Sequence, residues 1–180
     1  MSEKEKKITI YNTNYNFYRK YHRNIGNILV HILCIPAIVW SIFGFANKTG
    51  QYIGLDQTSY YKFIPSTSIY LSYMLYYYII APRKIFWQTF YFYFIILINS
   101  NSYYNSSNSI TKYLIVQILG WVFQIASHKY LEGNSPALLK GAVQSFITAP
   151  IFIVDELVQN LPGTNFALIT MIYSLYKLLY

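Results

Sequence analysis

Long stretches without a charged side chain are the clearest pattern in the sequence. Lys, Arg, Asp and Glu are absent from residues 24–47, 63–82, 85–111, 113–128, 141–154 and 157–176. A helix that crosses the hydrocarbon core of a bilayer needs about 20 mostly apolar residues. The pattern therefore predicts membrane helices within these runs, at 28–46, 64–81, Ile85–Ile98 and Tyr113–Ser127, with 141–154 and 166–180 as two further candidates.

These runs predict an all-α fold, a polytopic membrane bundle of four to six transmembrane helices. They are too long and too uniformly apolar to be barrel strands, whose residues alternate between apolar and polar. We expect one membrane domain over residues 1–180. Residues 1–16 form a polar N-terminal tail in this interpretation, and the Asn/Ser-rich residues 99–109 form a low-complexity loop.

Composition agrees with a membrane protein. Hydrophobic residues make up 54% of the chain and charged residues 11%, against about 25% charged residues in soluble domains. High hydrophobicity excludes a disordered chain, and a single cysteine, Cys34, excludes a disulfide scaffold. The net charge of +8 does not indicate nucleic-acid binding, because the basic residues cluster before the first span, at Lys4, Lys6, Lys7, Arg19, Lys20 and Arg23.

The same basic cluster predicts the orientation of the chain. Lys and Arg are enriched on the cytosolic side of membrane helices, so we expect a cytosolic N-terminus. Arg83 and Lys84 then return to the cytosol, and the two N-x-[ST] sequons, which start at Asn47 and Asn105, lie on the opposite side. This topology puts all three histidines of the chain on the cytosolic side.

One of these histidines belongs to a regular polar series. Gln124, His128 and Glu132 recur every four residues, so they share one helical face. Gly133 is suited to end that helix, and Ser135 with Pro136 is suited to start the next one. Two readings remain open here: a functional site, or a histidine that only forms a hydrogen bond between helices.

The other two histidines, His22 and His31, are nine residues apart. On one straight helix they would point in opposite directions. They can share a site only if the helix breaks between them, and we expect that break within Asn24–Asn27, where an Asn can cap the next helix. Without a break they are two unrelated histidines.

Three imidazoles and a nearby carboxylate can form a metal site. Imidazole suits Zn, Cu, Fe and Ni. We favour non-haem Fe(II) in a membrane setting without a thiolate pair, although spacing alone does not identify the metal.

Two segments of the chain resemble a known family. Residues 17–36 read FYRKYHRNIGNILVHILCIP, and residues 118–156 contain LGWVFQIASHKYLEGNSPALLKGAVQSFITAPIFIVDE. Both resemble the fungal 2-hydroxy fatty acid dioxygenases, small membrane proteins of the endoplasmic reticulum. The resemblance implies an Fe(II)-dependent oxidoreductase that uses O₂ to shorten a 2-hydroxy fatty acid by one carbon, in phytosphingosine breakdown. It also implies that His22, His31 and His128 either bind the iron themselves or are needed by the residues that bind it.

Further residues are candidates for the same site. Glu132 is expected as a catalytic residue, either a fourth ligand or a hydrogen-bond acceptor for a histidine N–H. Arg19, Arg23 and Gln124 are candidate substrate-binding residues. Glu156 is a candidate to face the same cavity, with Asp155 at the membrane interface. The expected partners are the 2-hydroxy fatty acid, O₂ and membrane lipid.

Other functions compete with this one. The main alternative is a non-enzymatic scaffold or lipid-binding protein of the endoplasmic reticulum membrane. A di-iron lipid hydroxylase needs around eight histidines, and the chain has three. A transporter is disfavoured because the sequence has no repeated halves. Acyl chain length, the number of spans beyond four and the oligomeric state are left open by the sequence.

Overall fold

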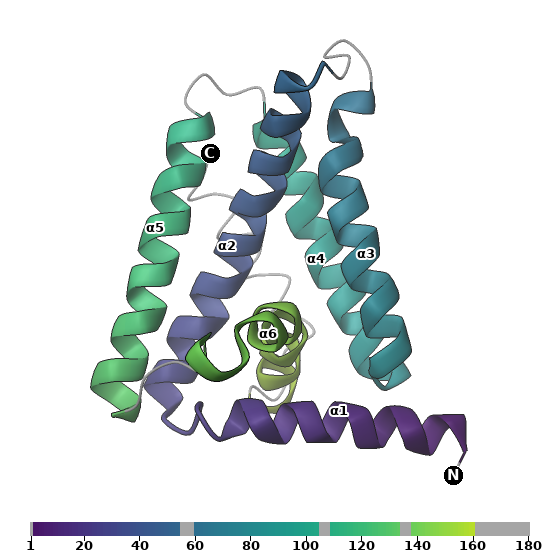
Figure 1. The fold of residues 1–180 in the computed structure, drawn as a ribbon, viewed down its shortest axis with the longest axis vertical. Helices are drawn as coiled ribbons and strands as arrows, with labels where there is room; N and C mark the ends of the chain where they lie inside the picture. The colour runs from purple at the N-terminus through teal and green to yellow at the C-terminus, as the bar shows by residue number, and fades with distance from the viewer. Residues whose placement is uncertain (1, 55–59, 105–108, 134–137, 161–180) are drawn as a thin grey trace.

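A computed structural model describes residues 2–54, 60–104, 109–133 and 138–160 (Figure 1). The candidate span 166–180, the Ser135–Pro136 cap and the Asn105 sequon lie outside these residues. The described part is helical, without a strand. Its elements are α1 (Glu3–Arg19), α2 (Ile25–Tyr52), η1 (Tyr60–Phe63), α3 (Ile64–Ile80), α4 (Arg83–Tyr103), α5 (Ser109–Ser127), η2 (His128–Glu132) and α6 (Leu138–Asn160). The predicted all-α class is confirmed.

Helices α2 to α5 form a bundle, and α1 and α6 cover one end of it. In Figure 1, α2, α3, α4 and α5 run roughly along the long axis, while α1 lies across their lower end and α6 sits just above α1. Helix α2 is central, since it contacts α3, α4, α5 and α6. Two glycines let α2 and α5 approach closely: a Cβ at Gly44 would overlap the Tyr113 ring, and one at Gly120 would lie 2.7 Å from Ile38 Cγ1.

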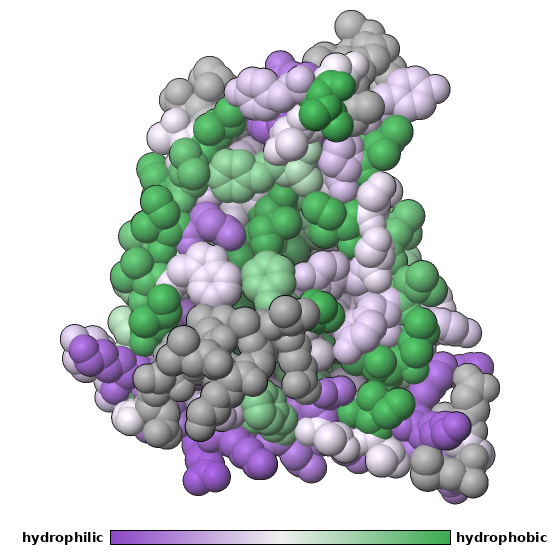
Figure 2. Space-filling view, viewed as in Figure 1, coloured by the Kyte–Doolittle hydropathy of each residue, from purple (hydrophilic) through white to green (hydrophobic). Residues whose placement is uncertain are grey.

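The outer faces of the long helices are strongly apolar. Figure 2 shows hydrophobic residues over the sides of the molecule and hydrophilic ones gathered along the edge where α1 lies. Large exposed patches of this kind mark contact with a membrane or another protein. Exposed members include Leu33, Leu71, Leu75, Ile79, Ile98, Ile118, Val122 and Phe123.

Two described helices are long and apolar enough to cross a membrane, Ile25–Tyr52 and Ile110–Glu132. The other predicted spans are helical too: 64–81 matches α3 except for its last residue, and 85–98 and 141–154 lie within α4 and α6. Length and hydropathy thus support two spans, and four to six are not confirmed among the described residues.

The two polar segments are more helical than their composition indicates. Residues 3–16 of the polar tail belong to helix α1, and residues 99–103 of the expected loop are the end of α4. Asn47, the first sequon, is fully buried; its side-chain amide donates to Asn101 Oδ1 at 2.8 Å, and its oxygen accepts from Ser66 N at 3.1 Å. The folded chain therefore does not present Asn47 for glycosylation.

Candidate metal centre

The histidine site begins with a break between α1 and α2. Helix α1 ends at Arg19 and α2 starts at Ile25, with Asn24 as N-cap accepting from Gly26 N at 2.8 Å. The predicted interruption exists, but it covers residues 20–24 rather than Asn24–Asn27. It turns the chain between His22 and His31, so that both rings lie on the same side.

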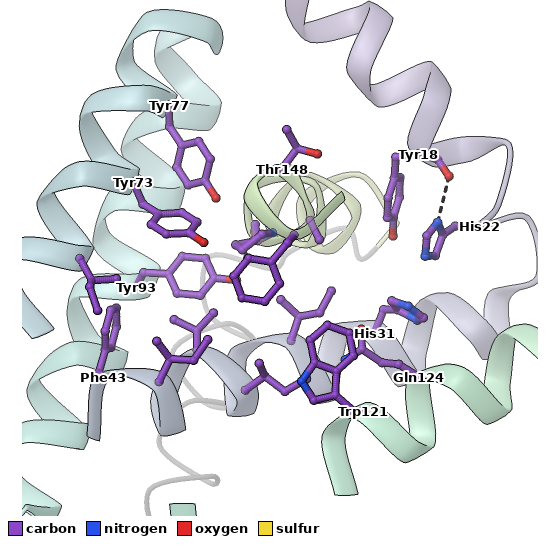
Figure 3. A pocket seen from close by; sticks show the side chains of 18 of the residues that line it. Tyr18, His22, His31, Phe43, Tyr73, Tyr77, Tyr93, Trp121, Gln124 and Thr148 are labelled. Atoms are coloured by element: carbon purple, nitrogen blue, oxygen red, sulfur yellow. Dashed lines mark hydrogen bonds between the residues drawn. The ribbon is translucent and has the colours of Figure 1, made fainter. Parts of the chain in front are cut away.

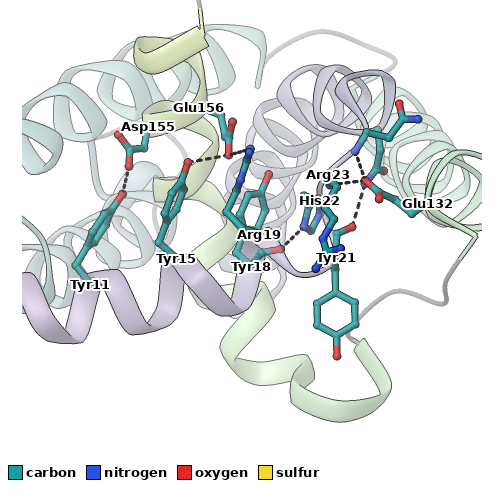
Figure 4. A network of polar contacts seen from close by, with 12 residues as sticks. Tyr11, Tyr15, Tyr18, Arg19, Tyr21, His22, Arg23, Glu132, Asp155 and Glu156 are labelled. Atoms are coloured by element: carbon teal, nitrogen blue, oxygen red, sulfur yellow. Dashed lines mark hydrogen bonds and ion pairs between the residues drawn. The ribbon is translucent and has the colours of Figure 1, made fainter.

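Glu132 fixes the position of this break. Its Oε1 accepts hydrogen bonds from Arg23 N and Asn24 N, both at 2.8 Å, and from Asn27 Nδ2 at 3.0 Å (Figure 4). The two backbone donors, Arg23 N and Asn24 N, precede α2 and have no partner within the helix. Glu132 closes the single π-helical turn of η2, and the chain then leaves through Gly133 at φ 67°, a conformation that favours glycine.

Asn27 is a buried residue of α2 that also connects this region to α5. It is fully buried, and its Oδ1 accepts from Ser127 Oγ at 2.6 Å. Its backbone carbonyl lies 2.9 Å from His31 Nδ1. Asn27 therefore links α5, α2 and a histidine ring. Sequence reasoning considered it only as a cap, because its partner is 100 residues away.

The three histidine rings meet at this junction. Ring centroids are 4.5 Å apart for His22 and His31, 4.7 Å for His22 and His128, and 4.8 Å for His31 and His128. All three residues are buried, and one ligand atom from each lies within 4.8 Å of the others. Among the described residues this is the one group of three or more His, Cys, Asp or Glu that could hold a metal ion.

Hydrogen bonds orient two of these rings. His22 Nδ1 lies 2.9 Å from the Tyr18 carbonyl and His31 Nδ1 lies 2.9 Å from the Asn27 carbonyl. A carbonyl only accepts, so each Nδ1 carries the proton and each Nε2 keeps a free lone pair. Metal-binding histidines are commonly held in this way.

Two other ring nitrogens of these histidines are unpaired, as expected for atoms that bind a metal. His22 Nε2 and His128 Nδ1 are buried and have no hydrogen-bond partner, which is unusual for polar atoms in a protein interior. Burial, followed by the charge on a protonated His31, lowers the pKa of His22 to about 2. His22 is therefore neutral at physiological pH, as a metal ligand must be.

An apolar cavity extends away from the histidines (Figure 3). One face of α2 lines it, from His31 through Ile35, Ile38 and Ile42 to Phe43. Those twelve steps correspond to about 18 Å along a helix. Aromatic and aliphatic side chains of α3, α5 and α6 form the other walls, including Tyr70, Tyr73, Met74, Trp121 and Ala149.

Other predicted site residues lie in different places. Gln124 is buried and lines the cavity, and its Nε2 donates to Gly120 O in its own helix at 3.3 Å. Arg23 is exposed, and its backbone N–H meets Glu132. Glu132 is outside the three-histidine group and braces the break between α1 and α2.

The acidic pair of α6 contacts α1. Asp155 is buried and accepts from Tyr11 Oη at 2.7 Å. Glu156 is fully buried and does not line the described cavity. Its Oε1 accepts from Tyr15 Oη and pairs with Arg19 Nη1, each at 2.9 Å (Figure 4). Both carboxylates therefore attach α1 to α6.

Comparison with known proteins identifies the family. The family model described as "Mpo1-like: 2-hydroxy-palmitic acid dioxygenase Mpo1-like" matches residues 8–161. The chain belongs to the Mpo1-like family. It is 26% identical over 140 residues to the 2-hydroxy-palmitic acid dioxygenase MPO1 of Saccharomyces cerevisiae, covering 78% of this chain and 75% of the relative. No solved structure matches the chain. The resemblance that the sequence carries is thus confirmed at the level of the family.

Proposed function

We propose that this Mpo1-like protein is an Fe(II)-dependent dioxygenase that shortens 2-hydroxy fatty acids by one carbon. The observation that carries the proposal is the group of three buried histidines at one end of an apolar cavity. The yeast relative is named as a dioxygenase of 2-hydroxy-palmitic acid, a molecule with a polar head and a long apolar tail. A polar site joined to an apolar cavity has the shape and polarity to accept such a molecule.

The proposed reaction balances without another reductant. One 2-hydroxy acid and one O₂ give the acid shorter by one carbon, one CO₂ and one water. The bond between the carboxyl carbon and the hydroxyl-bearing carbon breaks, and the latter becomes the new carboxyl group. The electrons lost by these two carbons reduce O₂.

In this proposal His22, His31 and His128 hold the iron through ring nitrogens. When bound, ferrous iron supplies the redox chemistry with O₂ and a chelation point for the substrate's hydroxyl and carboxylate groups. Three protein ligands would leave coordination positions free for the substrate and O₂. The Tyr18 and Asn27 carbonyls keep two rings neutral and oriented.

The rest of the chain positions the substrate. The α2 face from Ile35 to Phe43 receives the acyl tail and excludes water from the reacting end. Arg23 is exposed near the break, where it attracts an anionic head group. Arg19 acts indirectly, because its guanidinium pairs with Glu156 and so attaches α1. Gln124 contributes to the cavity wall beside His128.

We also propose a multi-pass protein of the endoplasmic reticulum membrane with a cytosolic N-terminus. The apolar outer faces and the two long apolar helices support a membrane location, and the endoplasmic reticulum follows from the family resemblance of the sequence. The basic residues before α2 support the orientation. Its substrate would enter the cavity from the lipid phase.

The test uses the full chain purified in detergent. Metal analysis should find iron, and 2-hydroxyhexadecanoic acid should be converted to pentadecanoic acid only when O₂ is present. A chelator should abolish conversion, and Fe(II) should restore it whereas Zn(II) should not. Hexadecanoic acid, which lacks the 2-hydroxyl group, is the matched control. Protein that binds no metal and leaves the hydroxy acid intact would favour a non-enzymatic, lipid-binding role.

A further inference from the structure

The hydroxyl of Tyr18 is a buried donor without a partner. Tyr18 is 7% exposed, and its Oη makes no hydrogen bond. Its ring stacks on His22, with centroids 3.9 Å apart and planes 12° from parallel. Figure 3 shows the two rings side by side, with the Tyr18 hydroxyl pointing into the cavity. A free donor therefore lies next to the histidine group.

Three other tyrosine hydroxyls along the cavity have structural roles. Tyr70 donates to Phe90 O at 3.0 Å, Tyr77 to Ile147 O at 2.7 Å, and Tyr93 to Pro150 O at 3.2 Å. Each of these bonds joins two helices. The Tyr18 hydroxyl lines the same cavity without such a bond, although a buried unpaired hydroxyl disfavours folding. A donor kept in this state is suited to bind a ligand.

The expected ligand is a carboxylate, and its negative charge indicates which groups of the protein can bind it. A carboxylate accepts hydrogen bonds only, so a buried one needs donors. The Nδ1–H groups of His22 and His31 are occupied by carbonyls. Gln124 donates to its own helix, and the Arg19 guanidinium pairs with Glu156. Apart from His128, whose Nδ1 is also unpaired and which we assign to the metal, the Tyr18 hydroxyl is the donor among these groups that makes no other hydrogen bond.

We propose that Tyr18 recognises the substrate's head group by donating a hydrogen bond from its Oη to the carboxylate of the 2-hydroxy acid. This assignment rests on the proposed function. It makes Tyr18 a substrate-contacting residue beside the histidines, and it predicts that binding discriminates acids from neutral lipids of the same length.

A stability measurement separates this role from a structural one. Tyr18→Phe keeps the ring stacked on His22 and removes only the unpaired hydroxyl. We expect the ligand-free variant to keep its metal content and to melt at the same temperature as the wild type or higher, since no hydrogen bond is lost. The matched control is Tyr113→Phe, outside the cavity, whose hydroxyl donates to Ser100 O at 3.3 Å. That control should melt at a lower temperature.

Binding without O₂ then tests the contact itself. The metal-loaded protein is titrated with 2-hydroxyhexadecanoic acid and with pentadecan-1-ol, which keeps the hydroxyl and the tail but lacks the carboxylate. We expect Tyr18→Phe to weaken binding of the acid about 10-fold or more, the size of one hydrogen bond to a charged group. Binding of the alcohol should change less than about twofold, and Tyr113→Phe should alter neither affinity.

Each contrary result has a distinct meaning. Equal effects of Tyr18→Phe on the acid and the alcohol would overturn the carboxylate contact while leaving the proposed function intact. A lower melting temperature or loss of metal in Tyr18→Phe would also overturn it, because the hydroxyl would then be structural. Wild-type protein that binds and converts no 2-hydroxy acid would overturn the proposed function, and this assignment with it.

Discussion

At the scale of single residues, the site depends on atoms that hold the histidines rather than on the histidines alone. His22 and His31 each place Nδ1 against the carbonyl four residues earlier, which leaves Nε2 free. The carbonyl that orients His31 belongs to Asn27. The side chain of Asn27 accepts a hydrogen bond from Ser127, the residue before His128. One buried amide thus connects the surroundings of two of the three histidines, and it has no charge or motif that would reveal it in the sequence.

Glu132 is the residue whose role can be tested most simply at this scale. Its carboxylate receives three N–H donors at the break between α1 and α2. We expect Glu132→Ala to weaken metal binding about 10–100-fold, the usual effect of removing a group that supports a ligand. Metal titration of the purified variant measures this, and helix content by circular dichroism should stay near that of the wild type.

Lys129→Ala is the matched control for Glu132→Ala. Lys129 lies in the same π-helical turn and is exposed, so its replacement should leave metal affinity unchanged. Unaltered affinity in Glu132→Ala would contradict the bracing role. Complete loss of metal, equal to that of a histidine variant, would instead make Glu132 a ligand.

At the scale of elements, helix α1 is attached to the bundle by polar contacts as well as by aromatic ones. Tyr11 packs edge to face on Phe152 and donates to the buried Asp155. Arg19 and Tyr15 both bind the fully buried Glu156. Because His22 follows α1 directly, the attachment of α1 helps to set the position of the first histidine.

Removing one of these hydroxyls should loosen α1. Tyr11→Phe leaves the Asp155 carboxylate buried without that donor, which costs about 1–3 kcal/mol. We expect a lower melting temperature, faster proteolysis within α1 and weaker metal binding. Tyr91→Phe, on an exposed position of α4, should change none of the three. If Tyr11→Phe were as stable and as protease-resistant as the wild type, the Tyr11–Asp155 contact would not attach α1.

The elements also show what can be predicted from the sequence. The series Gln124, His128 and Glu132 and the turn at Gly133 are local patterns, and the helical segment ends at Gly133 as they indicate, although its last turn, His128–Glu132, is π-helical rather than α-helical. The partners of Asp155 and Glu156 could not be predicted in this way. Their partners lie in α1, 137–144 residues away, and no local pattern specifies such a contact.

At the scale of the whole molecule, polar contacts join the helices at both ends of the bundle. The histidine junction and α1 lie at one end. Toward the other end, Asn47, Ser66 and Asn101 form a buried network between α2, α3 and α4. The apolar runs predicted that helices exist, whereas the number that cross a membrane depends on which faces meet lipid, which hydropathy alone does not give.

This network has a consequence for modification of the chain. Asn47 is fully buried and paired with Asn101, so we expect no N-glycan at Asn47 even when the protein is expressed in a eukaryotic endoplasmic reticulum. The measurement is electrophoretic mobility before and after glycosidase treatment, in a chain carrying Asn105→Gln so that Asn47 is the remaining sequon. A glycosidase-sensitive shift that disappears in Asn47→Gln would contradict the burial of this side chain.

The most direct test of the central claim is the replacement of each histidine by Ala, one at a time, with bound iron and product measured together. His22→Ala, His31→Ala and His128→Ala should each lose most of the bound iron and the conversion of 2-hydroxyhexadecanoic acid to pentadecanoic acid, because the three rings share one site. Full iron content and activity in one variant would exclude that histidine as a ligand. Full iron content and activity in all three variants would contradict the three-histidine metal centre.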